Sequence, residues 1–143
     1  ADHVRSLAVP PKIPEQPQSF VDAMCSSCHT PYMETSDGGS VALFSNLLLH
    51  DMGDGLTSYG GEGSASPTEW RTAPLVGFRG QLPDHRFLHD GRAANIDEAI
   101  RWHGGEARTS RDAYIALSTS EKLKLTSFVL ALMSSMPVPP KGD

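Results

Sequence analysis

Both cysteines of this 143-residue chain lie in one short segment, Cys25-Ser-Ser-Cys28, and His29 follows directly. A disulfide at this spacing would close a very small loop and would constrain the unfolded chain little. A redox-active dithiol belongs beside alternating strands and helices, a pattern that the sequence does not show. Zinc would need a fourth ligand besides these three side chains, and there is no second cysteine pair to supply one.

Covalent attachment of a haem uses every reactive residue of the segment. In a Cys-x-x-Cys-His motif the two thiols form thioethers with the haem vinyl groups, and the histidine becomes an axial ligand of the iron. The cysteines lie about one helical turn apart, so both can reach one side of a ring. We therefore expect one covalent haem c, attached through Cys25 and Cys28 and ligated by His29.

The composition agrees with a chain that folds around something other than protein. Only 38% of the residues are hydrophobic, and the chain has 13 glycines and 11 prolines, which predicts many loops and a small core. A net charge of −5 disfavours nucleic acid or an anionic membrane as a partner. No apolar run is long enough to span a bilayer. Attachment of haem c implies export, so a periplasmic or otherwise exported location is expected.

Proline-rich segments near the two ends of the sequence divide the chain into three parts. Residues 1–18 are expected to be a Pro-rich linker or the remnant of a missing N-terminal domain, and residues 137–143 a Pro-rich tail. Residues 19–136 are expected to form one haem domain. We predict a mainly α, cytochrome-c-like single domain, wrapped around one covalent haem, with long loops.

Helix starts are predicted from residues that can cap an N-terminus: Ser19, Asn95, Ser110 and Ser118. Asn95 and Ser118 each have a glutamate three residues later, the spacing of a capping box. The helix after Ser118 has an apolar stripe that predicts its core-facing side: Leu125, Phe128, Val129 and Leu132. The apolar segment 41–53 is either helix or strand, and its pattern does not decide between them.

The second axial position of the iron has several candidates among the remaining histidines and methionines. His103 has the strongest local argument, because it shares a helix face with Ile96 and Ile100. The glycines that follow it would let the backbone approach a flat ring. His50 and Met52 are the rival ligands. His89 is expected to bond to a carboxylate or a backbone turn instead of to iron.

Other side chains are candidates for contacts with the haem periphery. Arg71 and Arg92 are expected to hold the haem propionates, since arginine binds carboxylates with two parallel hydrogen bonds. Arg79 is expected to matter less. The aromatic residues expected in the core or against the haem are Trp70, Phe87 and Trp102.

Several longer motifs together resemble a known family. These are NLLLHDMGDGL, EWRTAPLVG, FLHDGRAANIDEAIRWHGGEA and LSTSEKLKLTSFVLAL. From about Val4 to Leu132 the chain resembles the C-terminal half of the di-haem oxidoreductases, peroxidases related to bacterial di-haem cytochrome c peroxidases and to MauG-like enzymes. The resemblance implies a cytochrome-c-like domain with an electron-transferring haem. In the peroxidase relatives the sixth ligand after the DEAI motif is Met, and in MauG-like members it is Tyr; the matching position here is His103.

The resemblance therefore implies a bis-histidine iron, whose potential should be lower than that of a Met-ligated one. We expect a one-electron carrier with an unidentified redox partner. The alternative is the electron-entry half of a di-haem peroxidase-like oxidoreductase, whose peroxide-reacting haem would lie in a missing N-terminal domain. Whether the chain is a fragment or a stand-alone protein stays open. Relatives hold calcium between domains, and no convincing ligand set for it is found here.

Overall fold

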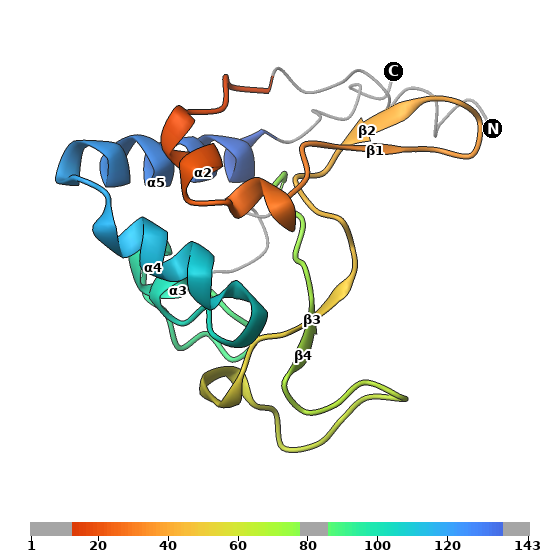
Figure 1. Cartoon of the computed structure of the whole chain (residues 1–143). Helices are drawn as coiled ribbons and strands as arrows, with labels where there is room; N and C mark the ends of the chain where they lie inside the picture. The colour runs from red at the N-terminus through yellow and green to blue at the C-terminus, as the bar shows by residue number, and fades with distance from the viewer. Residues whose placement is uncertain (1–12, 78–85, 136–143) are drawn as a thin grey trace, which may run out of the picture.

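The computed structural model describes residues 13–77 and 86–135 (Figure 1). Its α-helices are α2 (Gln18–Asp22), α3 (Ile96–Arg101), α4 (Arg108–Ala116) and α5 (Thr119–Ser134). Its strands are β1 (Tyr32–Glu34), β2 (Ser40–Ala42), β3 (Leu49–Asp51) and β4 (Glu69–Arg71). Three single turns of 3₁₀ helix are η1 (Cys25–Ser27), η2 (Asp54–Leu56) and η3 (Gly105–Ala107). Most of the predicted linker and all of the predicted tail lie outside the described residues.

The predicted fold class, a mainly α cytochrome-c-like domain, is wrong. Besides the helices, the described residues form two separate two-stranded antiparallel sheets, so the content is mixed. β1 pairs with β2, and β3 pairs with β4, with Leu49 opposite Arg71. The apolar segment 41–53, left undecided by its sequence pattern, contributes to both sheets. Strands of three residues are too short for period-two alternation to be recognised.

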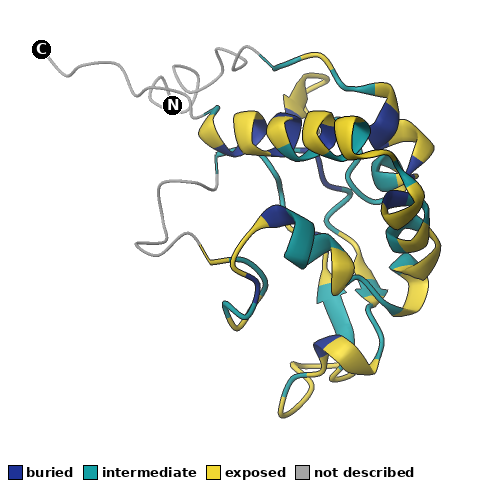
Figure 2. Cartoon of the chain, turned by 90° about the vertical axis from the view of Figure 1, so that its left-hand side faces the viewer, coloured by how far each residue is buried: buried dark blue, intermediate teal, exposed yellow. Residues whose placement is uncertain are grey.

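The core lies between α5 and the segments packed beneath it. Phe20 of α2, Phe44 and Phe128 of α5 meet edge to face, with ring centroids 5.3 to 6.2 Å apart. Tyr114 of α4 is fully buried beside them. The predicted α5 stripe is buried along its whole length, so this prediction is confirmed. Figure 2 shows the exposed outer face of the same helix.

Two of the four predicted N-caps are confirmed. The side chain of Asn95 accepts a hydrogen bond from the Glu98 amide, and Ser118 forms a capping box with Glu121. Ser19 lies inside α2 and is buried, and Pro17 precedes the helix in the cap position. Ser110 lies inside α4, which begins directly after η3. A short 3₁₀ turn leading into the helix replaces the expected cap.

Replacing Ser118 with alanine is expected to lower the free energy of unfolding by about 1 kcal/mol, because the backbone amide of Glu121 loses its acceptor. Urea unfolding followed by circular dichroism measures the change. Ser127, exposed on the same helix, provides the matched control: its replacement by alanine makes the same chemical change without removing a cap. Equal effects at both positions would contradict the capping argument.

Buried hydroxyl groups hold the loops that connect the two sheets. The Ser45 hydroxyl donates a hydrogen bond to the carbonyl of Thr72 at 2.7 Å and accepts one from the Leu47 amide at 2.9 Å. The Thr72 amide in turn bonds to the Leu48 carbonyl at 2.9 Å. These bonds fix the path of the chain into β3, which carries His50. Among the described helices none is long and apolar enough to cross a membrane.

Candidate haem site

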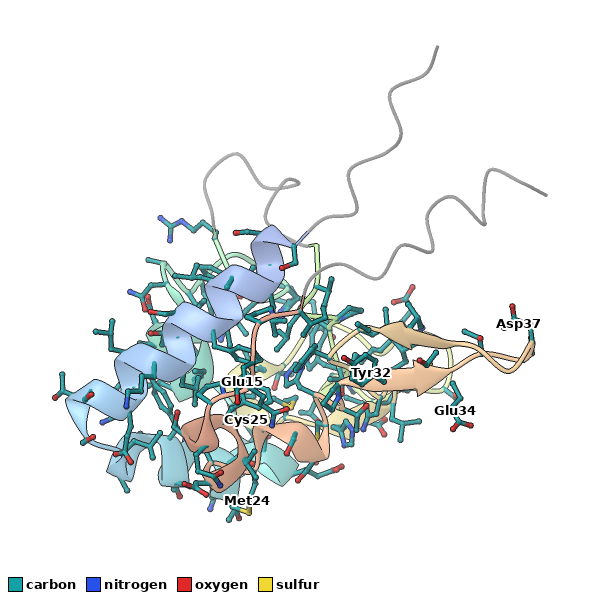
Figure 3. All side chains as sticks on the ribbon, turned by 90° about the horizontal axis from the view of Figure 1, so that it is seen from above. Glu15, Met24, Cys25, Tyr32, Glu34 and Asp37 are labelled. Carbon is teal, nitrogen blue, oxygen red and sulfur yellow. The ribbon has the colours of Figure 1, made fainter. Side chains whose placement is uncertain are left out.

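The Cys-x-x-Cys-His segment folds as a single helical turn. η1 begins at Cys25, and the amide of His29 donates to the Cys25 carbonyl at 2.9 Å, which closes the turn. Met24, directly before it, has a left-handed backbone conformation with φ of 56°, which turns the chain sharply after α2. Figure 3 shows Cys25 near the middle of the view and Met24 at the edge of the molecule. Both thiols and the imidazole thus belong to one compact turn.

Both thiols are favoured in their neutral form. Burial raises the pKa of Cys25 to about 11. The pKa of Cys28 is also raised, mainly by burial and further by the carboxylate of Glu106. Reactive cysteines of redox motifs have a lowered pKa. The environment of these two thiols therefore does not fit a redox-active dithiol.

His29 is oriented by the chain that follows β2. Its Nδ1 donates a hydrogen bond to the carbonyl of Phe44 at 2.9 Å, which leaves Nε2 as the atom able to bind a metal. This carbonyl is in place because residues 44–46 run beside residues 28–30: the Asn46 amide bonds to the Cys28 carbonyl at 2.8 Å. Burial lowers the pKa of His29 to about 4, so the ring is neutral, the form that ligates metals.

His103 has the same arrangement at the end of α3. Its Nδ1 donates to the carbonyl of Ala99, one turn earlier, at 2.9 Å, and burial lowers its pKa. The ring is therefore neutral, with Nε2 available. His103 lies close enough to His29 that a charge on its ring would lower the pKa of His29. Two neutral imidazoles from distant parts of the sequence thus lie near each other.

His50 lies near His29 as well, but both of its ring nitrogens are engaged. Nδ1 donates to the carboxylate of Glu106 at 2.9 Å, and Nε2 accepts from the side-chain amide of Asn46 at 3.1 Å. The lone pair that would bind a metal is therefore used by Asn46. Met52, the other rival ligand, follows β3 and is half-buried.

The two glycines after His103 lie close to the backbone of the segment that follows β3. A Cβ atom added at Gly104 would lie 2.7 Å from the carbonyl oxygen of Met52. One added at Gly105 would lie 2.7 Å from the amide nitrogen of Gly53, and closer still to a neighbouring carbonyl. The sequence analysis expected these glycines to admit a flat ring, whereas the contact that the structure shows is with the chain after β3.

The two arginines proposed for the propionates differ in their surroundings. Arg92 donates to the carboxylate of Asp90 at 2.6 Å, and its guanidinium carbon lies 4.8 Å above the ring centre of Trp102. Arg71 is exposed on β4, and within the described part of the chain its side chain has no hydrogen bond or ion pair. Arg79 lies outside the described residues.

The remaining predicted residues lie in different surroundings. His89 stacks on Trp70 with ring centroids 3.9 Å apart and lies 3.9 Å from a carboxylate oxygen of Asp90, a distance too long for the predicted hydrogen bond. Phe87 is partly buried against the core. Trp102 is 38% exposed.

The donor set fits a haem. Two thiols and two neutral imidazoles are what a covalently attached, six-coordinate haem takes from a protein. Three apolar side chains in or next to the same segments are exposed, namely Met24, Leu49 and Trp102. A zinc site needs about four protein ligands, and across residues 13–77 and 86–135 no group of three or more His, Cys, Asp or Glu side chains gathers to hold a metal.

Sequence analysis missed the groups that orient the imidazoles. The carbonyl of Phe44 could not be recognised, because its distance to His29 depends on the fold. The carbonyl of Ala99 is four residues before His103, a helical spacing that could have indicated the bond. The bond between Asn46 and His50 has the same spacing, whereas the bond from His50 to Glu106 joins residues that are 56 positions apart.

A Cys-x-x-Cys-His turn with a second neutral imidazole near its histidine defines a candidate haem-binding protein. The family model described as "Di-haem oxidoreductase, putative peroxidase" matches residues 5–132. The chain belongs to this family, as the sequence motifs predicted. No curated protein and no solved structure is similar enough to the chain to count as a match.

Proposed function

We propose that this chain carries one covalent haem c and transfers single electrons through it. Membership of the di-haem oxidoreductase family supports haem as the cofactor. The single Cys-x-x-Cys-His motif supports one covalent attachment in this chain. When bound, a haem iron supplies a reversible one-electron couple. The observation that carries the proposal is that His103, like His29 of the Cys-x-x-Cys-His turn, has Nδ1 bonded to a backbone carbonyl, and that the two rings lie near each other.

The residues of the chain favour electron transfer over reaction with peroxide. His29 and His103 each have Nδ1 bonded to a backbone carbonyl and Nε2 left for a metal. If both coordinate, the iron has no vacant position at which peroxide could bind. Two imidazoles should also give a lower potential than an imidazole with a methionine. We therefore infer a bis-histidine site that is catalytically quiet by itself.

Within the family, the proposed role is that of the C-terminal, electron-entry half of a larger oxidoreductase. The family name describes enzymes with two haems, and this chain has one attachment motif. A relationship to MauG-like enzymes and to di-haem cytochrome c peroxidases, a second haem domain as partner, and export to the periplasm belong to the same proposal. Arg71 is a better candidate for a propionate than Arg92, which already pairs with Asp90.

The protein produced with a haem c maturation system is expected to contain one covalent haem. Its intact mass should exceed the polypeptide mass by one haem, because thioethers from Cys25 and Cys28 survive denaturation. Acid acetone should leave the colour in the protein fraction. The visible spectrum of the oxidised and reduced forms should be low-spin in both states. A colourless protein, or one that releases its haem into acetone, would refute the proposal.

A further inference from the structure

We propose that Glu106 is a positioning residue that holds His103 in place for the iron. The proposal rests on the role of His103 as an iron ligand. Glu106 follows His103 by three residues, across the glycine pair, and its carboxylate contacts β3. Neither the sequence motifs nor the proposed ligand set assigns it a function.

Both oxygens of the Glu106 carboxylate bond to β3. Oε2 accepts from Nδ1 of His50 at 2.9 Å, and Oε1 accepts from the backbone amide of Asp51 at 3.0 Å. These two bonds, which we call the Glu106 bridge, join the chain after α3 to a strand that is distant in sequence. Because two donors share one carboxylate, the bridge fixes the direction of the side chain as well as its distance.

Two further hydrogen bonds connect the Glu106 bridge to the Cys-x-x-Cys-His segment. Nε2 of His50 accepts from the side-chain amide of Asn46 at 3.1 Å. The backbone amide of Asn46 bonds to the carbonyl of Cys28 at 2.8 Å. A continuous series of hydrogen bonds therefore connects the chain after His103 with the residue before His29. The series therefore links the two segments of backbone that carry the imidazoles.

The glycine pair after His103 also contacts the end of β3 directly through its backbone. Gly104 and Gly105 lie so close to residues 51–53 that a side-chain atom at either would collide with the backbone opposite. Gly105 also has φ of +48°, a conformation that side chains disfavour. The loop after His103 is therefore packed directly on the end of β3, at the position that the Glu106 bridge holds.

The bridge is charge-assisted at neutral pH. The hydrogen bond from His50, followed by that from the Asp51 amide, lowers the pKa of Glu106. The charge also lies near the site, since it contributes to the raised pKa of Cys28. The side chain of Glu106 is 58% exposed, so its loss should cost little global stability. Its effect should be local, on how often His103 leaves the iron.

The test measures displacement of His103 in the haem-loaded ferric protein. Imidazole is mixed with the protein in a stopped-flow instrument, and the change in the visible spectrum gives the rate at which the internal ligand is replaced. Glu106→Ala should accelerate the replacement about tenfold at saturating imidazole, because the loop loses two charge-assisted bonds. Glu106→Gln should recover part of the slower rate, since its amide oxygen can still accept from Asp51.

Glu98→Ala is the matched control. Glu98 also accepts a backbone hydrogen bond, from the Ala94 amide at 2.8 Å, but at the opposite end of α3. Its replacement should leave the rate unchanged. An unchanged rate in Glu106→Ala, or an equal acceleration in Glu98→Ala, overturns the positioning role.

His103→Ala, measured in parallel, separates this proposal from the one on which it rests. If His103→Ala becomes high-spin while Glu106→Ala exchanges at the original rate, only the role of Glu106 is refuted. If His103→Ala keeps the original low-spin spectrum, His103 is not the ligand, and both proposals are refuted. A low-spin resting spectrum in Glu106→Ala with faster exchange supports the bridge.

Discussion

Replacing His103 with alanine is expected to convert the ferric haem from low-spin to high-spin, because the iron loses one of its two strong-field ligands. A nearby group such as Met52 is the natural substitute, and in that case a methionine–iron band should appear in the red part of the spectrum. Exogenous cyanide or imidazole should bind to the variant readily. Visible and electron paramagnetic resonance spectra measure the spin state.

His50→Ala is the control for this substitution and should stay low-spin. The structure gives the reason: Nε2 of His50 accepts a hydrogen bond from Asn46, and Nδ1 bonds to Glu106. In His103, Nδ1 bonds to the Ala99 carbonyl, and among the residues that the structure describes Nε2 has no hydrogen-bond partner. A high-spin His50→Ala beside a low-spin His103→Ala would reverse the assignment. An unmodified protein that is already high-spin and turns over peroxide would favour an enzyme with an open iron.

Replacing Cys25 with alanine is expected to abolish most of the mature haem protein. Cys25 is half-buried and packs against the core, so its thioether would join the ring directly to the packed interior. The core itself is small, and ring burial should supply part of the stability. Haem content per polypeptide, from absorbance and amino-acid analysis, should fall to about a tenth or less. Cys28→Ala should behave in the same direction.

Ser27→Ala provides the matched control in the same turn. Ser27 is exposed and lies between the two cysteines, so its replacement changes the segment without removing a thiol. Haem content should equal that of the unmodified protein. Full haem loading of both cysteine variants would show that attachment through thioethers is not the mode of binding.

Features within one helix could be predicted from the sequence. The caps at Asn95 and Ser118 and the buried face of α5 depend on residues three or four positions apart, spacings that the sequence displays directly. The family motifs likewise identified the family that the chain belongs to. The helix after Asn95 was predicted as well, but it ends at Arg101, so His103 lies just past the helix on which the sequence analysis placed it.

Pairing between distant segments could not be predicted in this way. Leu49 lies opposite Arg71 in a sheet of two short strands, and three residues give too little pattern to indicate a strand. The expected α-helical class was wrong for this reason. The bond from Glu106 to His50 also depends on chain packing, and nothing in the local sequence of either residue indicates the other.

The placement of the two imidazoles has a consequence for unfolding. His29 belongs to the same short turn as both thiols, whereas His103 reaches the site only when the end of α3 is folded beside it. With haem bound as proposed, an unfolded chain would keep the ring and its nearby histidine but lose the distant one. The spin state of the iron would then report the local opening of the α3 region, separately from global unfolding measured by circular dichroism.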